Sequence, residues 1–219
     1  MLNILRYSSF ILLLLSFSIF YGCKKESNLP VDGDNNVYDT VVIGTQVWLA
    51  ENLKTTKYNN GVSIPLVTDN NQWTSISSAA YCWYENNPAV NKEPYGALYN
   101  GWALNVSFIC PLGYHAPNDE EWNILINYLG GEEIAGDKLK ATGTQFWGSG
   151  NYSTNESGFT AMPGGKRSQN DGTFWSKNSV GYWWSSTPEH YLIMNSSQSY
   201  AHIQGLGPRS GFSIRCIKD

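Results

Sequence analysis

Charged residues are scarce in this chain. Asp, Glu, Lys and Arg make up 15% of the 219 residues, and the formal net charge is −4, whereas roughly 25% charged residues is usual. A nucleic-acid-binding protein needs a basic face, so this class is excluded. Long apolar runs are also lacking, because no run approaches the roughly 20 residues of a membrane-spanning helix.

Aromatic residues and glycine are abundant instead. The chain has 9 Trp, 14 Tyr and 21 Gly, and aromatic residues make up 14% of it. This aromatic content is too high for a disordered chain. Together with many Asn and Ser residues and few Lys and Glu, it favours short strands and long loops over helices.

The N-terminus has the composition of an export signal. Arg6 is the only charged residue before Lys24, and the chain from Tyr7 to Tyr21 is apolar or small, as in a secretory signal peptide. Gly22-Cys23 then resembles the lipobox of bacterial lipoproteins. That resemblance implies export through the Sec route, acylation of Cys23, and attachment to the bacterial outer membrane or cell surface. An unlipidated secreted protein and a simple N-terminal membrane anchor are the alternatives.

Three regions follow from this interpretation. Residues 1–22 are the signal peptide, residues 23–37 are the lipidated cysteine and a flexible polar tether, and residues 38–219 are one domain. Removal of residues 1–22 takes away Arg6 and no acid, which leaves 13 − 18 = −5 formal charges. Asp32 and Asp34 begin a pattern similar to a calcium loop, but the glycine and the final glutamate of that loop are absent.

Local patterns predict an α+β domain with one main helix. Residues 119–129 form that helix, because Asn118 can cap it, Glu121 completes a capping-box pattern, and apolar residues recur at helical spacing from Trp122. Gly44-Thr45 predicts a tight hairpin turn within residues 40–50. A shorter helix is expected at residues 134–140. Further short strands are expected at residues 79–84, 158–162, 182–186, 191–194, 200–203 and 211–217.

Six separate segments resemble one bacterial family, in family order. They are Ile43-Gly-Thr-Gln-Val-Trp-Leu-Ala-Glu-Asn-Leu53, Tyr95-Gly-Ala-Leu-Tyr-Asn100, Cys110-Pro-Leu-Gly-Tyr-His-Ala-Pro-Asn-Asp-Glu-Glu-Trp122, Ser157-Gly-Phe-Thr-Ala-Met-Pro-Gly-Gly165, Tyr182-Trp-Trp-Ser-Ser-Thr187 and Ser213-Ile-Arg-Cys216. Residues 38–219 thus resemble the Fibrobacter succinogenes major paralogous domain. The resemblance implies an exported surface protein, often a lipoprotein, with a fold similar to C-type lectins and formylglycine-generating enzymes.

The resemblance also implies a disulfide. Exported chains meet an oxidising compartment, and with Cys23 acylated three cysteines remain. Lectin-like domains tie the region of their main helix to the last strand, which implies a Cys110–Cys216 bond here. Cys82 is then left over, and its position in a predicted strand favours a buried, inert thiol.

No catalytic or metal-binding motif is found. The chain lacks the Gly-x-Ser-x-Gly pattern of serine hydrolases, and His115, His190 and His202 have no metal-ligand spacing. The calcium-binding motifs of lectins do not match. Aerobic formylglycine-generating enzymes hold copper with paired C-terminal cysteines, whereas this chain has only Cys216 there. We therefore predict no catalytic residues, metal or cofactor.

Aromatic residues among Asn, Ser and Gly suit sugar recognition, because aromatic faces stack on pyranose rings. The sequence thus predicts a binding or adhesion module for a polysaccharide or an extracellular protein. An enzyme with a dispersed site, related to formylglycine-generating enzymes, and a passive envelope lipoprotein are the alternatives. Tryptophans that only pack the loops against a small sheet are a simpler explanation for any single Trp. The candidate ligand-binding residues are Lys166, Arg167, Asn170, Asp171, Trp175, Trp183 and Trp184.

Overall fold

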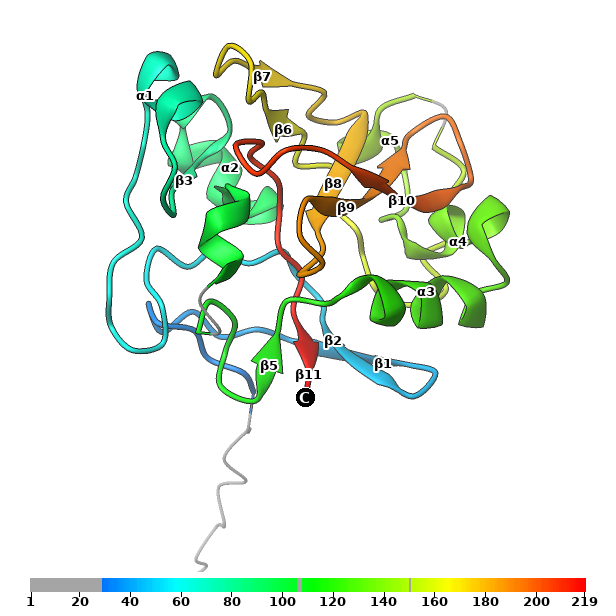
Figure 1. Ribbon diagram of the computed structural model, residues 1–219. Helices are drawn as coiled ribbons and strands as arrows, with labels where there is room; N and C mark the ends of the chain where they lie inside the picture. The colour runs from blue at the N-terminus through cyan, green and yellow to red at the C-terminus, as the bar shows by residue number, and fades with distance from the viewer. Residues whose placement is uncertain (1–28, 106–107, 150) are drawn as a thin grey trace, which may run out of the picture.

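The computed structural model describes residues 29–105, 108–149 and 151–219 (Figure 1). Their elements are short, and every strand pairing is antiparallel. No helix in these residues is long and apolar enough to cross a membrane. The helices are α1 (Asn70–Ser75), α2 (Pro88–Tyr95), α3 (Asp119–Tyr128), α4 (Glu132–Leu139) and α5 (Thr144–Trp147), with 3-10 turns at Tyr84–Asn86 and Gly101–Asn105. The strands are β1 (Thr40–Ile43), β2 (Gln46–Leu49), β3 (Tyr81–Cys82), β4 (Leu98–Tyr99), β5 (Tyr114–His115), β6 (Lys166–Arg167), β7 (Phe174–Trp175), β8 (Val180–Trp184), β9 (His190–Asn195), β10 (Ala201–Gly205) and β11 (Ile217–Lys218). The α+β class is confirmed.

One sheet joins the two ends of the domain. Its strand order is β1-β2-β11-β5, so the last strand lies between the N-terminal hairpin and the strand that precedes α3 (Figure 1). The hairpin predicted at residues 40–50 is present, and Ile43 pairs with Gln46 across its turn. Gly44 adopts a φ of +60° there, which the first position of a type II′ turn requires.

The C-terminal segment connects the remaining sheets. Strands β8, β9 and β10 form a three-stranded meander, and β3–β4 and β6–β7 are two-stranded pairs. Gly211, Phe212 and Ser213 form successive bridges to Arg167, Tyr99 and Trp183, which belong to three different sheets. The strand expected at residues 211–217 is therefore replaced by single bridges, and only Ile217–Lys218 forms a regular strand.

Helix α3 is positioned by the capping box that its sequence predicts. The Asn118 side chain accepts a hydrogen bond from the backbone N–H of Glu121 at 3.0 Å, and the Glu121 carboxylate accepts one from the N–H of Asn118 at 2.8 Å. Trp122, Leu125 and Ile126 are buried on one face of the helix. This face packs into a cluster that includes the stacked rings of Trp48 and Trp122, whose centroids lie 4.8 Å apart.

Strand β8 separates two apolar cores. Trp183 belongs to the cluster behind α3, whereas Trp184 belongs to the cluster around Phe212 and the disulfide. Successive side chains of a strand point to opposite faces, and both faces of β8 are covered here. Both tryptophans are thus buried. This explains why β8 has consecutive apolar residues and no alternation of apolar and polar ones.

A buried polar junction links the sheets behind Trp183. Arg215 donates to the carbonyl oxygens of Leu49 at 3.1 Å and Phe159 at 2.6 Å, and to Asn52 Oδ1 at 2.8 Å. Trp183 Nε1 donates to the same Asn52 oxygen at 2.8 Å. Burial lowers the pKa of the Arg215 guanidinium to about 9. We call Asn52, Trp183 and Arg215 the central junction; it joins three of the segments that carry the family resemblance.

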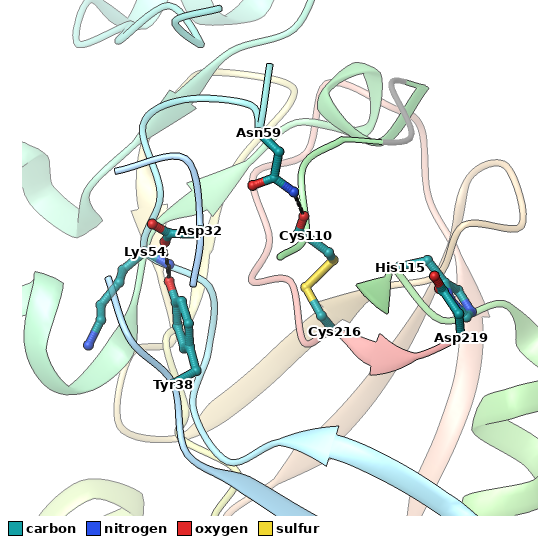
Figure 2. The surroundings of a disulfide bond; sticks show 8 residues. All are labelled: Asp32, Tyr38, Lys54, Asn59, Cys110, His115, Cys216 and Asp219. Carbon is teal, nitrogen blue, oxygen red and sulfur yellow. Dashed lines mark hydrogen bonds and ion pairs between the residues drawn. A yellow bond between two sulfur atoms is a disulfide. The ribbon is translucent and has the colours of Figure 1, made fainter. Parts of the chain in front are cut away.

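The expected disulfide is present at the edge of one core. Cys110 and Cys216 are joined across 106 residues, with their Cα atoms 6.0 Å apart (Figure 2). The Asn59 side chain donates to the carbonyl oxygen of Cys110, which ties a further loop to the bond. The disulfide therefore fixes the segment before β5 to the segment before β11.

The described part of the segment expected to be a tether is folded. This part, residues 29–37, forms a bridge between Val31 and Val37, and Asp32 is buried. Asp32 accepts a hydrogen bond from the hydroxyl of Tyr38 at 2.6 Å, and the Lys54 N–H donates to that hydroxyl at 3.0 Å (Figure 2). Residues 23–28 of this segment, Cys23 included, lie outside the described residues.

Other local expectations need correction. Residues 158–162 form no strand, because their one ladder contact is a parallel bridge between Ala161 and Lys140. The strand expected at residues 79–84 is reduced to β3 and runs into a 3-10 turn. Helices α1, α2 and α5 were not predicted, since each is too short to show a helical apolar period. The helix expected at residues 134–140 is α4, and the strands expected at residues 182–186, 191–194 and 200–203 correspond to β8, β9 and β10.

Candidate functional site

A short hairpin carries most of the candidate residues. Strands β6 and β7 pair so that Lys166 lies opposite Trp175 and Arg167 lies opposite Phe174. Alternation along each strand turns Lys166 and Trp175 to the outside and Arg167 to the inside, and the burial of Arg167 agrees. We call this element the 166–175 hairpin; it lies at the end of the molecule opposite the C-terminus (Figure 1).

Arg167 anchors the hairpin from its buried face. Its Nε donates to the carbonyl oxygen of Gly172 at 2.8 Å, within the hairpin itself. Its terminal nitrogens donate to the carbonyl oxygens of Val67 and Thr68, the latter at 2.9 Å, and to Asn70 Oδ1 at 3.0 Å. One fully buried guanidinium thus holds the hairpin against the loop that precedes α1.

Aromatic rings enclose the same guanidinium. It lies over the rings of Trp73 and Phe174, at 4.5 Å and 4.9 Å from their centroids. Cys82 is buried beside it, and burial raises the pKa of that thiol to about 12 despite the nearby positive charge of Arg167. Cys82 is therefore a protonated thiol at neutral pH, without the thiolate that reactivity needs.

A close approach of the backbone completes the anchor. Gly172 has a φ of +70°, and a Cβ atom there would lie 2.7 Å from the backbone of Asn70. Only glycine fits this combination of left-handed conformation and contact. The turn of the hairpin therefore packs against the start of α1 in a single arrangement. This contact makes the hairpin a rigid platform.

The outer face of the hairpin presents an oriented indole. The Trp175 side chain is 54% exposed, and its Nε1 donates to Thr173 Oγ1 at 2.7 Å. The Thr173 hydroxyl in turn donates to Asp171 Oδ1 at 2.7 Å, and the Thr173 N–H donates to the same oxygen at 3.1 Å. These hydrogen bonds lower the pKa of Asp171. The chain of bonds sets the indole plane and keeps a carboxylate beside it.

Four of the seven candidate residues meet at one open depression. Its volume is 330 Å³. Lys166 lies at its edge, with the ammonium 5.3 Å from the centroid of the Tyr182 ring. The depression is lined by Lys166, Ser168, Asn170, Asp171, Trp175 and Ser176.

The other three candidates lie away from this depression. Arg167, Trp183 and Trp184 are each at most 1% exposed, and Trp184 lines a different cavity, near the N-terminus of α3. Arg167 supports the hairpin, Trp183 belongs to the central junction, and Trp184 donates through Nε1 to the carbonyl oxygen of Tyr99 at 2.7 Å. The structure thus places these three side chains in structural contacts outside the depression.

Thr173, Ser168 and Ser176 were missed as site residues. Thr173 matters most, because it connects the indole of Trp175 to the carboxylate of Asp171. The sequence carries a usable signal for it, since Asp171-Gly172 is a turn dipeptide and a hydroxyl two residues after an Asp can close a local turn.

A second cavity lies near the N-terminus of α3. It has a volume of 210 Å³ and is lined in part by Trp102, Ser185 and Glu189. Beside it, Asp119 accepts a hydrogen bond from the Ser185 hydroxyl at 2.6 Å and contacts His190 Nδ1 at 2.5 Å. The serine hydroxyl points to the carboxylate and not to the imidazole. This arrangement lacks the serine–histidine contact that activates a nucleophile.

His115 is also engaged in structural contacts. Its Nδ1 lies 2.7 Å from Asp219 and its Nε2 lies 2.8 Å from Glu121. Burial lowers the pKa of His115, but the two carboxylates outweigh burial and raise the pKa overall. Across residues 29–105, 108–149 and 151–219, no group of three or more His, Cys, Asp or Glu side chains is placed to hold a metal ion.

Comparison with known proteins identifies a family. The family model described as Fibrobacter succinogenes major domain matches residues 41–218. This match covers the hairpin, the central junction and the disulfide. Neither the curated proteins nor the solved structures include a match to the chain.

Proposed function

The chain belongs to the Fibrobacter succinogenes major domain family, and from the geometry of its 166–175 hairpin we propose that it is a lipid-anchored surface module that binds glycan. The observation that carries this proposal is the exposed indole of Trp175, which a chain of hydrogen bonds through Thr173 holds beside the Asp171 carboxylate. The domain acts without catalysis in this account.

Stacking on Trp175 supplies the apolar part of recognition. The axial C–H groups of a pyranose ring present a flat apolar face, and an indole offers a matching surface of large area. Because the indole is already oriented, little side-chain entropy is lost when a sugar binds. The preformed platform thus favours a rigid ring over a flexible peptide.

The polar groups around the indole supply hydrogen bonds to sugar hydroxyls. Asp171 accepts, Lys166 donates, and Asn170 does both. One cation and one anion at the same depression leave it without a net charge. The electrostatics therefore favour a neutral glycan over a sulfated or uronic-acid polymer.

We further propose a C-type-lectin-like fold. Three features support it: the terminal strands β1, β2 and β11 share one sheet, a long-range disulfide ties the segment before the main helix to the last strand, and the loop-rich half of the chain carries the candidate site. A solved structure of this domain superposed on a lectin domain tests this proposal, and a different strand order in the superposition would refute it.

The anchor is proposed from the N-terminal sequence. Acyl chains on Cys23 would bury many CH₂ groups in a bilayer, each contributing about 0.8 kcal/mol, so attachment to the outer membrane or cell surface would be stable. Cys23→Ala is expected to abolish labelling of the protein by a clickable palmitate in growing cells. Unchanged labelling would refute the anchor and leave the glycan proposal standing.

A glycan array tests the binding function. We expect the folded chain to bind a subset of neutral glycans, and Trp175→Ala to reduce that binding by at least about tenfold, which corresponds to roughly 1.4 kcal/mol. The substitution removes the stacking surface and leaves the Arg167 anchor intact. Circular dichroism would show that both proteins are folded.

Tyr152→Ala is the matched control. Tyr152 is 88% exposed and lies outside the hairpin, so its loss removes an exposed aromatic without altering the depression. Equal losses in the two variants would indicate non-specific aromatic adhesion. Absence of binding to every glycan tested would contradict the proposed function.

A further inference from the structure

An exposed leucine is held at the tip of a rigid turn. The Tyr114 N–H donates to the carbonyl oxygen of Pro111 at 2.9 Å, and Gly113 has a φ of +80°, as in a type II turn. Leu112 occupies the first central position of this turn and is 90% exposed. The adjacent disulfide at Cys110 fixes the turn to the C-terminal strand.

Neighbouring residues extend this apolar tip into a surface. A shallow hollow of 380 Å³ lies beside the turn, and Val31 on its rim is 43% exposed. Lys218 reaches the same place, because it pairs with Tyr114 across β11 and β5. We call this surface the basal patch; it consists of Leu29, Val31, Leu112, Tyr114 and Lys218.

The described part of the chain begins at this patch. Leu29 is the first described residue, and residues 30–38 are packed onto the domain, since the Tyr38 N–H donates to the carbonyl oxygen of Pro30 at 3.0 Å. Only residues 24–28 separate Leu29 from Cys23. Six residue steps span at most about 20 Å when fully extended.

A body on such a short connection cannot stand far from the membrane. The end of the domain where the described chain begins also holds β5, β11 and the C-terminus, whereas β6 and β7 lie at the other end (Figure 1). Exposure of an apolar side chain at the anchored end is less unfavourable in free energy when that side chain lies in the headgroup region than when it lies in water.

We propose that the basal patch rests on the lipid surface, with Leu112 inserted at the headgroup level and the 166–175 hairpin directed away from the membrane. This inference rests on the proposed acylation of Cys23. Lys218 supplies positive charge toward anionic headgroups. The occupant of the patch is thus the bilayer that holds the anchor.

Depth-dependent fluorescence quenching tests this orientation. The full acylated chain carrying Leu112→Cys, labelled with a thiol-reactive fluorophore, is placed in phosphatidylethanolamine–phosphatidylglycerol vesicles that contain headgroup-nitroxide lipid. Selective labelling is feasible because Cys82 is buried and Cys110 is bonded to Cys216. Lys218→Cys is a second position in the patch, and Asn170→Cys on the hairpin is the distant control.

We expect quenching at positions 112 and 218 to exceed quenching at position 170 by at least threefold. Similar quenching at all three positions would overturn the proposal, because the body would then tumble on its anchor. Energy transfer between labelled copies at position 112 would assign the patch to a second copy and also overturn it. A chain that fails to sediment with the vesicles would refute the lipid anchor at Cys23. It would also refute the contact of the basal patch with the membrane, which depends on that anchor.

Discussion

Two regions of this molecule are built around a fully buried arginine, and they differ in what lies beyond it. Arg167 and Arg215 each donate to backbone carbonyl oxygens and lie against aromatic rings. Neither forms an ion pair with a carboxylate in the part of the chain that the structure describes. Arg215 is enclosed by packed protein, whereas Arg167 lies under a hairpin whose opposite face carries the exposed Trp175.

The comparison separates support from recognition. A guanidinium that binds several carbonyl oxygens fixes the segments that supply them, whether or not a ligand site lies above. At the central junction this connection joins buried segments. At the hairpin the same connection orients a surface, so changes at the two arginines should affect different measurements.

Removal of Arg215 should have the largest effect on stability. Arg215→Met leaves the carbonyl oxygens of Leu49 and Phe159 buried without their donor, and we expect a loss of about 3–5 kcal/mol in the free energy of unfolding. Urea unfolding followed by near-ultraviolet circular dichroism measures this loss. A change below about 1 kcal/mol would show that the central junction contributes little to the stability of the fold.

Removal of the disulfide should rank next. Replacement of both Cys110 and Cys216 by Ala is expected to cost about 2–5 kcal/mol, because the bond closes a long loop in the unfolded chain. The Arg167 side chain and the disulfide share no hydrogen-bond partner, so in a combined variant the two losses should add within about 0.5 kcal/mol. A strongly non-additive result in denaturant titrations would indicate that the hairpin and the disulfide region unfold together.

Removal of Arg167 should affect both stability and binding. Arg167→Met is expected to cost about 2–3 kcal/mol, since Thr68, one of its acceptors, is exposed, whereas Leu49 and Phe159 at the junction are both buried. Hydrogen exchange should accelerate in residues 166–175 while β8 and β9 remain protected. Uniform acceleration across the domain would remove the distinction between the two arginines.

Removal of the exposed indole should have almost no effect on stability. Trp175→Ala is expected to change the free energy of unfolding by no more than about 0.5 kcal/mol, because Trp175 is more than half exposed, at 54%. Trp183→Ala provides the contrast, with an expected loss of about 3–5 kcal/mol. Thermal unfolding of the two variants side by side measures both, and a large loss from Trp175→Ala would place this side chain in the core.

The pH dependence of the His115 contact should be the smallest effect. The pKa of His115 is raised in the folded chain, so its stabilisation is fully present below the unfolded pKa of about 6.5 and is lost as pH rises through the higher folded value. Solvent screening limits it to less than about 1 kcal/mol. We expect the stability difference between the native chain and His115→Gln to shrink as pH rises above 6.5. A difference that grows with pH would show that folding lowers the pKa of His115.

Much of the fold was predictable where local signals were strong. The capping box at Asn118 and Glu121, the Gly44 turn and the apolar period from Trp122 each depend on neighbours in sequence, and each element formed as predicted. The short helices α1 and α2 could not be predicted, because each buries only one or two side chains. The bridges of Gly211, Phe212 and Ser213 to three sheets depend on tertiary packing that no local pattern records.

The grouping of the candidate residues was predictable in part. The loop composition pointed to the 166–175 hairpin region, and Lys166, Asn170, Asp171 and Trp175 lie together there. Arg167 was indistinguishable from Lys166 in sequence, since strand alternation decides which of the two faces inward. Strand alternation places Trp183 and Trp184 on opposite faces of β8, but only the tertiary structure shows that both faces are covered.

The indole resonances of the tryptophans test the central claim most directly. In a ¹⁵N-labelled chain titrated with a neutral glycan selected on the array, the Trp175 Nε1–H resonance, assigned by its loss in Trp175→Phe, should shift in proportion to occupancy. The buried indoles of Trp183 and Trp184 should stay in place. A shift of the Trp102 resonance with no change at Trp175 would contradict the account and move the binding site to the cavity beside α3.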